Sequence, residues 1–191
     1  MKVYYKKLIQ LYYFFINNTY TFMGGFNMRN RFKVAIVGAS GIVGRTVLKV
    51  LEEKRFPNVE YTLFCSKKSA GKKIEFLETN YILQELTENS FNKSFDYAIF
   101  CAGGSTSKKY IPLAVEHDCV CIDNSSVYRM DKEVPLVVPE VNMQEAFKNK
   151  GIIANPNCST IQAVVALKPL DDTYHIKRIV YSTYQAVSGA G

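Results

Sequence analysis

Short apolar runs alternate with segments of helical periodicity along most of the chain. The runs at residues 32–37, 60–65, 96–101, 119–123 and 151–154 are nearly continuous, as in strands buried on both faces of a parallel sheet. After three of them, apolar residues recur at helical spacing, at residues 47–51, 110–115 and 161–167. The alternation of strands and helices predicts an α/β fold with a doubly wound (Rossmann-type) parallel sheet.

Two segments do not fit this alternation. Residues 74–91 alternate only weakly and predict no definite element. Residues 176–186 alternate as a half-buried strand, which we expect to belong to another sheet, after an exposed connector at residues 171–175.

A glycine-rich turn follows the first predicted strand. Residues 38–44 read Gly-Ala-Ser-Gly-Ile-Val-Gly, a G-x-x-G-x-x-G spacing between strand and helix. Glycines permit a tight turn, and the helix N-terminus then faces a diphosphate. The motif predicts a dinucleotide site; a glycine-rich turn without a ligand is the alternative.

The second predicted strand ends in a basic segment. An NAD-selective site places an acidic residue here for the ribose 2′-hydroxyl, whereas this chain reads Ser-Lys-Lys-Ser at residues 66–69. Cations flanked by hydroxyls suit a 2′-phosphate, so NADP is the predicted cofactor. The alternative is a solvated lysine loop.

Cys158 lies where the last buried strand meets a helix. Free N–H groups at a helix N-terminus favour the nucleophilic thiolate, although a lone cysteine is more often a buried, inert residue. Arg129 follows another strand in a polar loop on the same side of the sheet. It could hold phosphate or carboxylate, or be an ordinary surface arginine.

Composition limits the classes of function. The net charge of +7 arises mostly in residues 1–31, with five basic residues and no acid, so residues 32–191 carry 19 basic and 17 acidic residues. This balance argues against a nucleic-acid partner. The five cysteines lack metal-ligand spacing and suit a reducing compartment, here the cytoplasm. The leader at residues 1–27 has an apolar run too short to span a membrane, and we expect translation to start at Met28.

Together these segments resemble the aspartate-semialdehyde dehydrogenase family. The stretches that carry the resemblance are residues 38–44, 69–71, 122–126 with Arg129, 134–142, 153–162 and 182–191. N-acetyl-glutamyl-phosphate reductases are similar in the first strand and glycine turn, but typically read Pro-Gly-Cys where this chain has Pro156-Asn157-Cys158. A reductase of that kind, or a non-catalytic dinucleotide-binding module, is the alternative function.

The resemblance implies reductive dephosphorylation of aspartyl phosphate to aspartate semialdehyde by NADPH, or its reverse, through a thioester on Cys158. It assigns substrate binding to Arg129, Asn157 and Gln185. It assigns cofactor binding to Gly38, Ser40, Gly41, Ile42, Val43, Lys68, Ser69, Ser188 and Gly189. The family usually has arginine at Lys68, so a weaker preference for NADP is expected.

The resemblance also implies an NADP-binding domain at residues 28–157 and the beginning of an α+β catalytic and dimerisation domain at residues 158–191. The family's base, a histidine, and a substrate-binding arginine belong to the remainder of that domain, and the full-length family forms homodimers or homotetramers. Neither His117 nor His175 is a plausible substitute. We therefore expect this polypeptide by itself to be inactive or nearly so.

Overall fold

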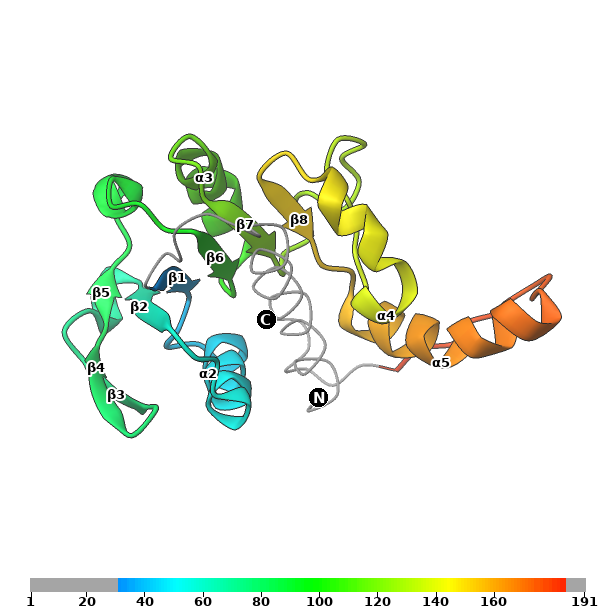
Figure 1. The fold of residues 1–191 in the computed structure, drawn as a ribbon, viewed down its shortest axis with the longest axis horizontal. Helices are drawn as coiled ribbons and strands as arrows, with labels where there is room; N and C mark the ends of the chain where they lie inside the picture. Colours follow the sequence, from blue (N-terminus) through cyan, green and yellow to red (C-terminus); the bar gives the residue numbers. More distant parts are fainter. Residues whose placement is uncertain (1–30, 185–191) are drawn as a thin grey trace, which may run out of the picture.

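The computed structural model describes residues 31–184. The leader at residues 1–27 and the predicted site residues Gln185, Ser188 and Gly189 lie outside the described residues. A six-stranded parallel sheet forms the centre, in the order β5-β2-β1-β6-β7-β8 (Figure 1). Its strands are β1 (Phe32–Val37), β2 (Val59–Cys65), β5 (Gln84–Glu85), β6 (Tyr97–Phe100), β7 (Val120–Asp123) and β8 (Ile152–Ala154). The predicted doubly wound parallel sheet is confirmed.

The α-helices are α2 (Ile42–Lys54), α3 (Gly104–Val115), α4 (Pro139–Asn142) and α5 (Cys158–Tyr174). Short 3₁₀ helices are η1 (Lys67–Ser69), η2 (Glu88–Phe91) and η3 (Met143–Lys148). The three predicted helical segments lie within α2, α3 and α5, whereas α4 and the 3₁₀ helices were not predicted. α5 continues to Tyr174, so residues 171–174 are helical and the predicted connector was wrong there. No helix within residues 31–184 is both long and apolar enough to cross a membrane.

Both faces of the sheet are buried, as the continuous apolar runs predict. Val34 and Ile36 of β1 belong to the apolar core that contains the buried residues of α2. Ala35 and Val37 belong to the core on the α3 side. Successive side chains of a strand point to opposite faces, so each strand supplies both cores. Figure 1 shows α2 and α3 on opposite sides of the sheet.

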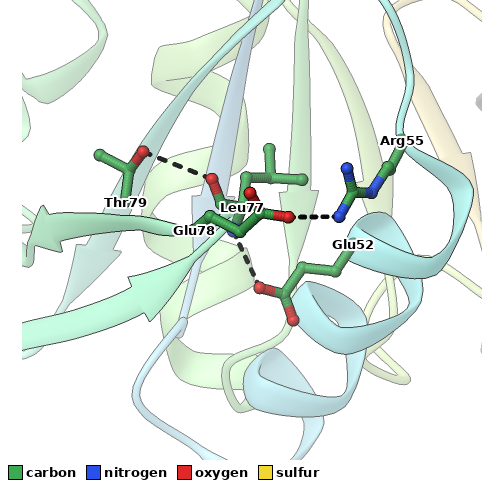
Figure 2. Close-up of polar contacts among 5 residues, drawn as sticks. All are labelled: Glu52, Arg55, Leu77, Glu78 and Thr79. Carbon is green, nitrogen blue, oxygen red and sulfur yellow. Dashed lines mark hydrogen bonds and ion pairs between the residues drawn. The ribbon is translucent and has the colours of Figure 1, made fainter.

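A small hairpin occupies the segment for which the sequence predicted no element. Strands β3 (Lys73–Phe76) and β4 (Thr79–Ile82) pair antiparallel around a turn at Leu77 and Glu78, both with positive φ. Figure 2 shows that α2 holds this turn: Leu77 N–H donates to Glu52 Oε1 at 2.8 Å, and Arg55 pairs with Glu78. Hairpin turns with positive φ usually carry Asn-Gly or Asp-Gly, so Leu-Glu gave no signal.

The predicted strand at residues 176–186 is wrong over its described part. Residues 176–184 follow α5 with no strand assignment, and Val180 and Tyr184 are exposed. A β-strand requires a hydrogen-bonded neighbour, and the described residues place none beside this segment. The alternating pattern alone therefore predicted a strand that residues 176–184 do not form.

Candidate dinucleotide and thiol site

A cleft of about 470 Å³ opens at the carboxyl ends of β1, β2 and β6. Parallel α/β sheets bind ligands at this edge. Three of the predicted cofactor-binding residues, Gly38, Ser40 and Gly41, line the cleft. Ile42 and Val43 begin α2 and are not part of its lining; Ile42 is exposed and Val43 packs on the core.

Steric limits explain two glycines of the turn. Gly38 has φ +86°, in the left-handed region, and a Cβ there would lie 2.9 Å from Ala102 N. A Cβ on Gly44 would lie 2.1 Å from Gly38 O. The first turn of α2 has no acidic residue and no side-chain cap, so its N–H groups remain available. The turn and this helix terminus suit a dinucleotide diphosphate.

The end of β2 meets the cleft through a pair of residues two positions earlier than the predicted pair. Ser66 and Lys67 line the cleft, whereas Lys68 and Ser69 lie farther along η1. The roles predicted for Lys68 and Ser69 remain predictions. Sequence reasoning missed Glu85, which also lines the cleft, because β5 comprises only two residues.

A hydrogen-bonded ring joins the loops that follow β7 and β8. Asn155 Nδ2 donates to Asn124 Oδ1 at 2.8 Å. Arg129 donates from Nε to Asn155 O at 2.9 Å and from Nη2 to Asn124 O at 3.0 Å. These bonds use only part of the guanidinium, whose remaining N–H groups could still bind an anion. Arg129 thus stands beside the segment that leads into Cys158.

A buried carboxylate stabilises the loop that carries Asn124 of this ring. Asp123, at the end of β7, is fully buried and accepts hydrogen bonds from Ser107 Oγ at 2.7 Å and from Ser125 N at 2.9 Å and Oγ at 2.6 Å. Ser107 belongs to α3, so the carboxylate ties that helix to the loop carrying Asn124. Buried charges are tolerated where their hydrogen bonds are satisfied.

Cys158 is the first residue of α5, as the strand-to-helix reading predicted. Its side chain is partly exposed, whereas the other four cysteines are buried. The N-cap is Asn157, whose Oδ1 accepts from Ser159 N at 3.0 Å and lies 4.0 Å from Cys158 Sγ. The predicted substrate-binding residue therefore also caps the helix that carries the thiol.

The histidines lie away from this thiol. His175 caps the far end of α5, about 25 Å from its start at 1.5 Å per residue. His117 follows α3 and contacts Asn92 Oδ1 at 3.1 Å from Nε2. Neither imidazole is hydrogen-bonded to Cys158, and the expectation that neither histidine is the base stays a prediction.

We expect Cys101, which lines the cleft, to make the stability of the fold sensitive to alkaline pH. Burial, and secondarily the charge of Asp123, raises its pKa from 9.0 to about 12. Between these values the unfolded chain loses the thiol proton while the folded chain keeps it, so unfolding is favoured as pH rises. We expect the free energy of unfolding to fall between pH 9 and 12 and to fall less steeply in Cys101→Ser. Urea unfolding at several pH values measures this; equal slopes in both proteins would contradict it.

The glycine turn, free helix N-terminus and cleft at the sheet edge define a dinucleotide-binding α/β domain. The comparison with family models is specific: residues 33–150 match the semialdehyde dehydrogenase, NAD binding domain. The chain belongs to the semialdehyde dehydrogenase family.

Individual relatives agree with this assignment. The chain is 60% identical to an aspartate-semialdehyde dehydrogenase of Aquifex aeolicus, over 84% of this chain and 48% of the relative. An aspartate semialdehyde dehydrogenase II of Vibrio cholerae, solved complexed with ASA, is 47% identical with a TM-score of 0.73, over 77% of this chain and 48% of that one. A Candida albicans enzyme solved with NADP is 28% identical with a TM-score of 0.63, over 76% and 48%.

The resemblance to aspartate-semialdehyde dehydrogenases is thus confirmed. The chain spans about half the length of the relatives it matches.

Proposed function

We propose that this chain provides the dinucleotide site and the nucleophile of an NADP-dependent aspartate-semialdehyde dehydrogenase, in aspartate-family amino-acid biosynthesis. The observation that carries the proposal is the position of Cys158 at the start of α5, three residues after Asn155, whose carbonyl oxygen accepts a hydrogen bond from Arg129. The names of the relatives favour an aspartyl substrate over the N-acetyl-glutamyl alternative.

The proposed chemistry begins at the Cys158 sulfur. The thiolate attacks the carbonyl carbon of aspartyl phosphate, a C–S bond forms, and the C–O bond to phosphate breaks with its electron pair leaving on phosphate. Arg129 holds the phosphate through its remaining N–H groups, and Asn157 fixes the helix start and orients the acyl group. A nicotinamide cofactor, when bound, would supply the hydride to the thioester carbonyl, and the C–S bond would then break to give the aldehyde and release the Cys158 thiolate.

NADP is the proposed cofactor because the residues after β2 are cationic. Lys67 lines the cleft, and Lys68 with Ser69 follow it in η1. Ammonium groups near a ribose favour a 2′-phosphate. We further infer a cytoplasmic enzyme, acting on small molecules without nucleic acid or membrane, that assembles as a homodimer or homotetramer at full length. We expect turnover by this polypeptide alone to be very slow, because neither histidine is hydrogen-bonded to Cys158.

Formation of the thioester gives a test that does not require turnover. We expect aspartyl phosphate to add one aspartyl group to the chain, seen by intact mass, at a site that peptide mapping assigns to Cys158. Cys158→Ser should lose the adduct completely, because a neutral hydroxyl is a far weaker nucleophile.

Cys101→Ser is the matched control and should keep the adduct, since that thiol is buried. No adduct on the wild-type chain, together with tight dinucleotide binding, would favour the non-catalytic binding module instead. An adduct that persists in Cys158→Ser would refute the assignment of the nucleophile.

A further inference from the structure

Glu85 is an acidic residue in the dinucleotide cleft that the sequence did not single out. β5 pairs with the end of β2, with Glu85 in register with Cys65. This pairing brings Glu85 into the lining of the cleft that also holds Lys67. Within residues 31–184 the Glu85 carboxylate has no ion-pair partner, and the residue is exposed. One negative and one positive side chain therefore border the same cleft.

The charge of Glu85 is felt inside this cleft. The pKa of the Cys65 thiol is raised mainly by burial, next by the negative charge of Glu85, and Lys72 opposes the increase. Cys65 itself lines the cleft. An anion bound in the cleft would also be repelled by this charge, and less strongly the more the cleft is open to water.

A carboxylate and an ammonium act oppositely on the two cofactors. A carboxylate accepts hydrogen bonds from ribose hydroxyls, as in NAD, and repels a 2′-phosphate, which carries close to two negative charges. An ammonium attracts that phosphate. The place of Glu85 on β5, instead of at the end of β2, leaves the position after β2 free for lysines, so the site carries both determinants.

We propose that Glu85 is a specificity-determining residue that weakens binding of the 2′-phosphate and so reduces the preference of the site for NADP over NAD. The inference rests on the proposed dinucleotide site. It concerns only residues of the described chain, and its test requires binding and no turnover.

Calorimetric titration of the full chain with NADPH and with NADH tests the proposal in wild type and Glu85→Gln. Removal of the carboxylate charge should tighten NADPH binding about three- to tenfold and leave NADH binding unchanged or slightly weaker. Titration with 2′,5′-ADP and 5′-AMP, which differ only in the 2′-phosphate, should show the same difference without the nicotinamide.

Glu60→Gln is the matched control. Glu60 borders a neighbouring groove of about 350 Å³ that Glu85 also borders, but Glu60 does not line the dinucleotide cleft. The Glu60→Gln substitution removes an equal charge nearby and should change neither the affinity for NADPH nor the affinity for NADH. Equal effects of Glu85→Gln on both cofactors, or none, or the same shift in Glu60→Gln, would overturn the inference. Failure of wild type to bind either cofactor would instead refute the proposed dinucleotide site.

Discussion

Gly44→Ala should strongly destabilise the fold, because the glycine turn and α2 meet at van der Waals contact. A Cβ on residue 44 would lie 2.1 Å from Gly38 O and 2.7 Å from Ala39 Cα, both backbone atoms. These backbone atoms belong to a turn that starts at a glycine with positive φ, so moving them would strain the turn. Overpacking of this kind costs about 3 kcal/mol or more, a large part of the stability of a typical domain.

Gly41→Ala is the control for the same motif. Its Cβ would approach Gly38 O only to 3.4 Å, an ordinary contact, and its φ is negative. We expect a change within about 1 kcal/mol at this position. Since the chain has no tryptophan, urea unfolding is followed by circular dichroism. If the free energy of unfolding fell by comparable amounts in the two variants, the close backbone contact would not explain why residue 44 is glycine.

Asp123→Ala is expected to destabilise the fold nearly as much, by about 3 kcal/mol or more, since it leaves buried donors without an acceptor. Ser107 Oγ, Ser125 N and Ser125 Oγ all donate to this carboxylate. Without the acceptor, the buried donors of Ser107 and Ser125 have lost their hydrogen bonds to water and gain none in the protein. Loosening of this cluster should also weaken the ring of Asn124, Arg129 and Asn155 above it.

Ser107→Ala separates these contributions. It removes one donor and leaves the carboxylate two hydrogen bonds from Ser125, so a loss of about 1 kcal/mol is expected. Denaturant unfolding of both variants, with Cys158 alkylation rates as a second readout, makes the comparison. A similar small decrease in the free energy of unfolding of both variants would mean that Asp123 does not organise the cluster.

Several elements could be predicted because their signals are local. The buried strands, α2 and α3 follow from runs and spacings of a few residues, and the turn at Gly38 follows from its position between strand and helix. The β3–β4 hairpin was missed because its turn is stabilised by Glu52 and Arg55, more than twenty residues earlier. Residues 176–184 show the converse: a strand pattern without a neighbouring strand stays irregular.

The sequence alone determined the α/β architecture, the glycine turn and the start of a helix at Cys158, because each depends on residues adjacent in the chain. Only the tertiary structure decided that Lys67 and Glu85 line the same cleft and that Arg129 joins Asn124 to Asn155. The Asn124–Asn155 bond spans 31 residues of sequence. Contacts of this kind arise where parallel strands end at one edge of the sheet, and no local pattern encodes them.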